Sequence, residues 1–264
     1  MTHDLLLALD VGNTNITLGA YKGEELVAHW RMGTNRHITA DELALAFSGL
    51  FRLQGLGEPT EVLAGAASSS VVPPLDRAIR DWGERYLNGR ILVVDRTVDL
   101  GINIRYNPPE AVGADRLVNA VAAYHAYGGP CIVVDFGTAT TYDAIAENGD
   151  YLGGAIAPGL GISADALHRA ASKLPQTELA KPTAAIGVTT ADSLTSGLVY
   201  GYAAQVDGMV RRFRRELGPN ARAIATGGLA GLICAETEEV SEVDPWLTLD
   251  GLRLIWEKTM NDER

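Results

Sequence analysis

Two segments far apart in the chain carry one pattern: an apolar run, an aspartate, and a glycine turn rich in Asn or Thr. The first segment reads LLLALDVGNTNIT (residues 5–17) and the second reads IVVDFGTATT (132–141). Glycine lets the backbone of such a turn approach an anion, and Asn and Thr supply neutral hydrogen-bond donors. The aspartates, Asp10 and Asp135, would face the metal that accompanies phosphate groups. The duplicated pattern predicts two half-sites for one nucleotide.

Two further motifs, ATGG and GADR, are interpreted together with this pair of turns. A single Asp-x-Gly turn is common structural punctuation, but its repetition after a second apolar run favours phosphate binding. The run ATGG (225–228) follows a predicted strand, and its glycines would let adenine or ribose lie against the backbone; a strand-to-helix turn is the alternative. GADR (113–116) opens a predicted helix, where Asp115 and Arg116 could equally be a first-turn acid and a solvated arginine.

Composition restricts the class of protein. The chain has 264 residues, 47% of them hydrophobic and 21% charged, as expected for a globular protein with a substantial core. The net charge of −11 and the pI of about 4.9 disfavour a surface that binds nucleic acid. No apolar run reaches the roughly 18 to 20 residues that span a membrane, and no signal peptide is visible, so we expect a cytoplasmic protein without a membrane segment.

The elements that must position these motifs follow an α/β order. Residues 5–32 predict three antiparallel strands, Thr39 caps a helix, residues 62–70 pass from a strand into a small-residue turn, and a helix begins at Pro73. In the second half the pattern predicts a helix at 112–127, strands from 132, at 153–159 and at 221–226, and helices at 161–171, 190–215 and 247–256. The break at 106–110 predicts two domains, 1–111 and 112–264.

The ordered set of motifs resembles one family. DVGNTN (10–15), GADR (113–116), DFGTATTYD (135–143), GGAIAPG (153–159) and TGG (226–228) are similar to those of type III pantothenate kinases. These belong to the superfamily of sugar kinases, actin and Hsp70-type ATPases. The resemblance implies two ribonuclease H-like (actin-like ATPase) domains, with mixed sheets flanked by helices and a nucleotide cleft between them. It also implies ATP-dependent phosphorylation of pantothenate to 4′-phosphopantothenate, the first step of coenzyme A biosynthesis.

The resemblance also implies a role for each matching residue. Asp115 would be the catalytic base. The ATP-binding residues would be Asp10, Val11, Gly12, Asn13, Thr14, Asn15, Ile16, Thr17, Thr138, Gly227 and Gly228. The pantothenate-binding residues would be Tyr106, Gly113, Ala114, Asp115, Arg116 and Thr190, with Thr189 as a possible substitute for Thr190. Asp10 would lie on the magnesium side, and Asp135 would bind a monovalent cation.

The implied cofactors and partners follow from the same resemblance. They are Mg²⁺ with ATP, a monovalent cation (K⁺ or NH₄⁺), the substrates ATP and pantothenate, and a second copy of the chain in a homodimer. The chain has no GxxxxGK[ST] loop whose lysine would reach the phosphates, so bound cations would supply the positive charge. Two alternatives stay open: another small-molecule kinase of the superfamily, and a non-catalytic regulatory relative.

Overall fold

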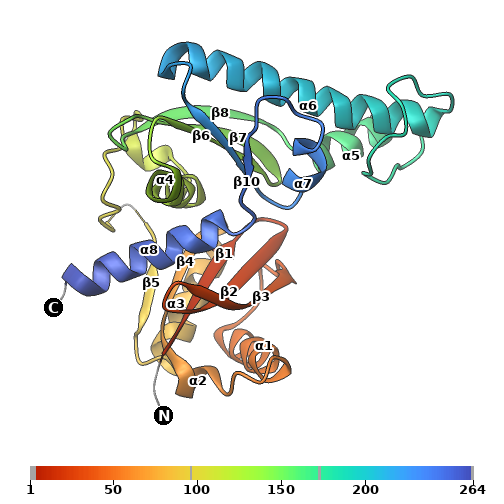
Figure 1. Cartoon of the computed structure of the whole chain (residues 1–264). Coiled ribbons are helices and arrows are strands. Elements are labelled where there is room, and N and C mark those ends of the chain that lie inside the picture. The colour runs from red at the N-terminus through yellow and green to blue at the C-terminus, as the bar shows by residue number, and fades with distance from the viewer. Residues whose placement is uncertain (1–3, 96, 172–173, 263–264) are drawn as a thin grey trace. The chain divides into compact units, whose positions relative to one another are not determined.

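The computed structural model describes residues 4–95, 97–171 and 174–262, which form two compact units (Figure 1). The first unit comprises Met1–Gly101, Glu110–Ala122 and Thr248–Arg264, and the second comprises Ile102–Pro109 and Ala123–Leu247. The units interleave along the chain because two later segments, Glu110–Ala122 and Thr248–Arg264, pack with the N-terminal residues. A single domain boundary at residue 111 stays a prediction.

The first unit is built on a mixed five-stranded sheet in the order β3-β2-β1-β4-β5. Its strands are β1 (Leu5–Val11), β2 (Asn15–Lys22), β3 (Glu25–Gly33), β4 (Leu63–Ser70) and β5 (Ile91–Val93). The first three are antiparallel, as the sequence predicts, and β4 and β5 pair in parallel. The serines at the end of β4 correct one prediction: they lie in the strand and pair with β1, because the ladder continues past the apolar residues.

Helices cover both faces of this sheet. They are α1 (Ala40–Leu53), α2 (Pro59–Val62), α3 (Pro73–Tyr86), the N-terminal part of α4 (Ala114–Tyr127) and most of α8 (Leu247–Asp262). Leu7 and Leu9 of β1 face α1 and α3, whose Phe47 and Trp82 meet edge to face at 4.9 Å. Thr39 and Glu42 form the capping box that begins α1.

The opposite face of the sheet receives α8. Trp256 of α8 lies so close to Gly65 of β4 that a β-carbon on Gly65 would approach its ring to 2.2 Å. Leu249 packs in the same way against Gly19 of β2. Residues alternate between faces along a strand, so this is also the face on which Asp10 lies.

The second unit repeats the architecture of the first. Its strands are β6 (Cys131–Phe136), β7 (Ala139–Ile145), β8 (Tyr151–Pro158), β9 (Arg222–Thr226) and β10 (Glu242–Val243). The sheet order is β10-β9-β6-β7-β8, with β6, β7 and β8 antiparallel and β9 and β10 parallel to their neighbours. Read from its other edge, β8-β7-β6-β9-β10, this sheet has the same strand order as the first sheet, β3-β2-β1-β4-β5. The internal duplication predicted from the two hairpins is confirmed.

The helices of the second unit are α5 (Leu160–Ala170), α6 (Thr190–Leu217) and α7 (Ala230–Cys234). The long helix α6 lies along one face of the sheet, where Val199, Val206 and Val210 pack on Ile132 and Val134 of β6 (Figure 1). The sequence did not predict α2, β10 or the short 3-10 helix Pro109–Ala111. No helix of the described residues is long and apolar enough to cross a membrane.

Candidate active site

The first hairpin turn, between β1 and β2, is closed and braced by hydrogen bonds. Gly12 N donates to Asn15 O at 2.9 Å, which closes the turn. Thr34 Oγ1 donates to Gly12 O at 2.6 Å, and Arg36 Nη2 donates to Asn13 Oδ1 at 2.8 Å. The tip of the turn stays exposed. A fixed, exposed turn of this kind presents its backbone N–H groups to an anion at low ordering cost.

Asp10, at the base of this turn, lies beside a hydroxyl and a second carboxylate. Ser69 of β4, which is fully buried, donates a hydrogen bond from Oγ to Asp10 Oδ1 at 3.2 Å. The pKa of Asp10 rises to about 7, mainly because burial removes the group from water and also because Asp115 carries a like charge. The hydrogen bond from Ser69 opposes this rise.

Asp115 lies in the first turn of α4, and a glycine makes room for it. A β-carbon on Gly113 would lie 2.6 Å from Asp115 Oδ1, so a side chain there would displace the carboxylate. Asp115 Oδ1 accepts a hydrogen bond from Arg116 N at 2.8 Å. Burial raises the pKa of Asp115, and the N–H and positive charge of Arg116 oppose the rise. A carboxylate with a raised pKa is a stronger base than a solvated one.

The carboxylates of Asp10 and Asp115 thus lie close enough for the charge of one to disfavour ionisation of the other. A divalent cation bound between or beside them would reduce this repulsion. Among the described residues, no group of three or more His, Cys, Asp and Glu side chains could hold a metal ion by itself. Mg²⁺ is commonly held by one or two carboxylates together with substrate phosphates. The residues present therefore fit Mg²⁺ bound with a nucleotide.

The second hairpin turn, between β6 and β7, is shorter than the first and has different neighbours. Gly137 N donates to Ala139 O at 3.1 Å, and Thr138 is exposed at the tip. Asp135 lies against the TGG turn that follows β9. A β-carbon on Gly227 would come within 2.5 Å of Asp135 Oδ1, and Gly227 has a φ of +92°. This turn thus needs glycine for both space and backbone conformation.

The remaining predicted contacts lie in the second unit. Tyr106 lies against β8, where a β-carbon on Gly153 would meet its ring at 3.2 Å. Thr189 is the N-cap of α6: its Oγ1 accepts a hydrogen bond from Asp192 N at 3.1 Å and donates one to Asp192 Oδ2 at 2.7 Å. Thr190 is the first residue of α6 and is exposed. Because the Thr189 hydroxyl caps α6, Thr190 is the residue of the two whose hydroxyl has no capping role.

The structure thus groups the predicted residues by unit. The first unit holds Asp10 to Thr17, Gly113, Ala114, Asp115 and Arg116, and the second holds Tyr106, Asp135, Thr138, Thr190, Gly227 and Gly228. Sequence reasoning missed Ser69. Its signal is the run of serines at the end of a buried strand, a pattern that predicts a turn.

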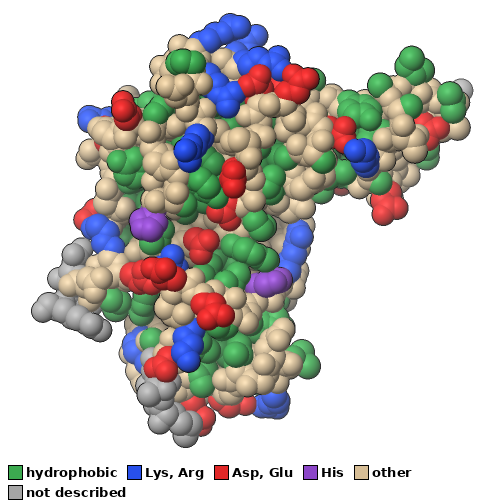
Figure 2. Space-filling model, viewed as in Figure 1, with side chains coloured by type: hydrophobic (Ala, Val, Ile, Leu, Met, Phe, Trp, Pro, Cys, Tyr) green, Lys and Arg blue, Asp and Glu red, His purple; other side chains and the backbone are tan. Residues whose placement is uncertain are grey.

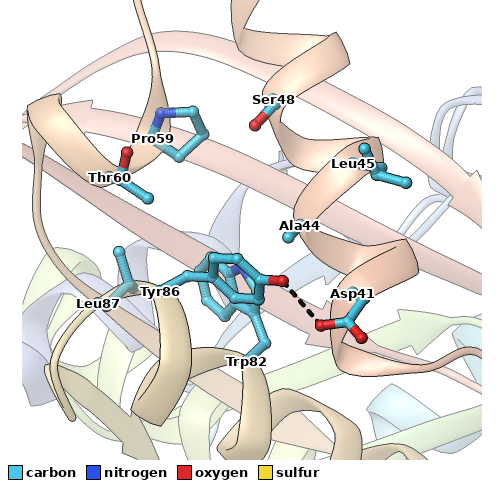
Figure 3. Close-up of a pocket in the computed structure, with 9 residues that line it drawn as sticks. All are labelled: Asp41, Ala44, Leu45, Ser48, Pro59, Thr60, Trp82, Tyr86 and Leu87. Carbon is cyan, nitrogen blue, oxygen red and sulfur yellow. Dashed lines mark hydrogen bonds between the residues drawn. The ribbon is translucent and has the colours of Figure 1, made fainter.

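A separate cavity lies on the α1 and α3 side of the first sheet. It has a volume of about 410 Å³, and its lining includes Trp82, Ala44 and Leu87 (Figure 3). Its one carboxylate, Asp41, accepts a hydrogen bond from Tyr86 Oη at 2.7 Å and pairs with Arg85. The sheet separates this cavity from the face of Asp10, so it is not part of the carboxylate pair.

Positive side chains gather over the C-terminal end of α6 (Figure 2), whose last turn carries Arg214 and Arg215. Glu239 pairs with Arg214 and, at 2.7 Å, with Arg211. This pairing reduces the positive field that the cluster offers to a polyanion.

The repeated five-stranded sheet with an aspartate-glycine hairpin in each unit defines an actin-like ATPase or sugar kinase fold. Solved structures agree. An activator of 2-hydroxyisocaproyl-CoA dehydratase from Clostridium difficile matches with a TM-score of 0.57 at 14% identity, over 98% of this chain and 97% of that one. An inorganic polyphosphate/ATP-glucomannokinase from Arthrobacter sp. strain KM matches with a TM-score of 0.51 at 16% identity, over 97% and 99%. At these identities the likeness shows the fold alone.

Sequence comparison identifies the family within this fold. The family model for type III pantothenate kinase matches residues 6–212. The type III pantothenate kinase of Roseiflexus castenholzii is 51% identical, over 96% of this chain and 98% of its own length. That of Moorella thermoacetica is 49% identical, over 96% and 99%. The chain belongs to the type III pantothenate kinase family.

Proposed function

We propose that this protein transfers the γ-phosphoryl group of ATP to pantothenate and forms 4′-phosphopantothenate, the first step of coenzyme A biosynthesis. The observation that carries this proposal is the position of Asp115. It lies in the first turn of α4, in the same unit as the Asp10 turn, in a chain of this family. The helix N-terminus also favours negative charge at this point.

The proposed reaction needs positioning more than covalent chemistry. The acceptor hydroxyl oxygen bonds to the γ-phosphorus while the bond from that phosphorus to the β,γ-bridging oxygen breaks and ADP leaves. Asp115 orients the hydroxyl and accepts its proton late in the step, because an alcohol is too weak an acid for earlier removal. Mg²⁺ bound with the phosphates would neutralise the charge that develops on them, and Asp10 is the residue that would hold it.

We assign ATP contacts to three turns. The first hairpin, Asp10 to Thr17, would bind phosphate groups through its backbone, and Thr138 would contribute from the second hairpin. Gly227 and Gly228 would lie against the adenosine. That both hairpins hold the same triphosphate stays a prediction.

Pantothenate would bind near the start of α4. Gly113 and Ala114 form the loop, and Arg116 offers a planar guanidinium suited to a carboxylate such as that of pantothenate. Tyr106 and Thr190 are assigned as further contacts, with Thr190 preferred over Thr189 because the latter caps α6.

Three features are proposed from the family alone. Asp135 would bind a monovalent cation, K⁺ or NH₄⁺, the protein would act as a homodimer, and it would work in the cytoplasm.

The test is a coupled assay with pantothenate, magnesium-ATP and potassium on the Asp115→Asn variant. The loss of the base should lower kcat about 10³-fold, within the range typical of general-base removal, with the KM for pantothenate little changed. Glu110→Gln is the matched control, because Glu110 is an exposed carboxylate five residues earlier, and it should keep full activity. Full activity of Asp115→Asn would remove the proposed base.

A panel of other small alcohols in the same assay separates the two remaining alternatives. Turnover of a sugar in place of pantothenate would indicate another small-molecule kinase. ATP binding without turnover of any acceptor would indicate a regulatory relative.

A further inference from the structure

We propose that Ser69 is a positioning residue: its hydroxyl fixes the orientation of the Asp10 carboxylate, holding Oδ1 and leaving Oδ2 directed at the cation that accompanies ATP. The inference rests on the proposed function, which assigns that cation to Asp10. Ser69 is fully buried, and its Oγ lies 3.2 Å from Asp10 Oδ1. Because the Ser69 side chain is shielded from water, its hydroxyl must find its hydrogen-bond partner within the protein.

The register of the sheet explains why this contact is rigid. Asp10 and Ser69 are Cα partners in the parallel pair of β1 and β4, so both side chains leave the same face of the sheet. Both are short side chains on central strands, and each therefore has little rotamer freedom. Asp115 repels the Asp10 carboxylate, and a hydrogen bond to a fixed strand resists its displacement. Partners that orient a metal ligand in this way commonly affect metal affinity 10- to 100-fold.

The second unit repeats the arrangement. Thr226 of β9 is the Cα partner of Asp135, just as Ser69 is the partner of Asp10, and Thr226 is also buried. A hydroxyl residue thus stands beside the hairpin aspartate in both halves of the duplicated fold. The recurrence indicates that this position serves the aspartate, since packing alone would accept alanine there.

Ser68 provides a matched control. It is the neighbour of Ser69 on β4 and is equally buried, but it pairs with Leu9 and faces the core under α1 and α3. Its Oγ has no hydrogen-bond partner among the described residues. Ser68→Ala and Ser69→Ala therefore remove the same atom from the same strand, and only the second removes a bond to Asp10.

The experiment measures the binding of manganese-ATP, without pantothenate, by the water proton relaxation that bound Mn²⁺ enhances. This readout does not depend on turnover. Ser69→Ala should raise the Kd of the complex about 10-fold or more, whereas Ser68→Ala should stay within about 2-fold of the unmodified protein. A Kd for Ser69→Ala within 2-fold, or an equal rise for both variants, would overturn the proposal.

Asp10→Asn separates this inference from the proposed function. If Asp10→Asn leaves the Kd unchanged, the assignment of the cation to Asp10 fails, and the role of Ser69 fails with it. If Asp10→Asn weakens binding and Ser69→Ala does not, only the role of Ser69 fails. In the double variant, Ser69→Ala should add no further loss to Asp10→Asn, because it acts through that carboxylate; additive losses would contradict the proposal.

Discussion

The two hairpins share a residue pattern and a place in their sheets, but they have different surroundings. In both, a glycine N–H closes the turn, and the aspartate before it lies between hydroxyl residues on the neighbouring strands: Thr17 and Ser69 for Asp10, Thr141 and Thr226 for Asp135. Asp115 raises the pKa of Asp10 through its like charge. Asp135 lies against the glycine turn that follows β9. The comparison teaches that equivalent residues of a duplicated scaffold can differ in chemistry, because different groups pack beside them.

The largest expected effect comes from replacing each aspartate in turn. Asp10→Asn should lower kcat/KM about 10³-fold, or about 4 kcal/mol, because it removes the proposed magnesium-side carboxylate. Asp135→Asn should instead remove the activation by K⁺ or NH₄⁺ and leave the Mg²⁺ dependence of the residual rate intact. Rates measured over a matrix of Mg²⁺ and K⁺ concentrations distinguish the two. The same cation response in both variants would show that the hairpins are not specialised as proposed.

The glycines of the two regions should also differ. A β-carbon on Gly227 would lie 2.5 Å from Asp135 Oδ1 and 2.7 Å from Phe136 N, on a backbone with φ of +92°. Gly227→Ala should therefore lower the free energy of unfolding by about 3 kcal/mol, since it combines overpacking with backbone strain. Gly12→Ala would meet only Asn15 O, at 3.1 Å, and should cost less. Urea unfolding measures both, and equal losses would contradict this difference.

The sequence predicted most of the scaffold because its signals are local. The capping box at Thr39, the proline start of α3 at Pro73 and the apolar runs before Asp10 and Asp135 each determine structure within a few residues. The motif GADR predicted that Asp115 begins a helix, and the structure places it in the first turn of α4.

Two features could not be predicted from the sequence because they depend on contacts between residues far apart in the chain. The role of Ser69 depends on which strand lies beside β1, and that strand is more than fifty residues away in sequence, so local pattern shows only small polar residues. The packing of α8 on the first sheet is equally non-local: it depends on Gly65 and Gly19 leaving room for Trp256 and Leu249. Neither glycine stands in a turn motif, so nothing in their immediate neighbours indicated a helix from the end of the chain.

The smallest expected effect tests the burial of Asp10 through stability. Its pKa is about 7 in the folded protein and 3.8 as a free group, so between these pH values the folded state binds a proton that the unfolded state does not. Ligand-free stability should therefore fall as pH rises from about 4 to 7 and level off above, because the charged form is disfavoured where it is buried. Asp10→Asn removes this penalty.

Asp10→Asn should thus unfold at a higher temperature than the unmodified protein at pH 8, and this gain should vanish near pH 4. Thermal unfolding at several pH values, without nucleotide or divalent cation, measures it. Asp135→Asn is the parallel variant in the other hairpin. A pH-independent effect of Asp10→Asn would show that its carboxylate is solvated, and that the two hairpins differ less than their neighbours suggest.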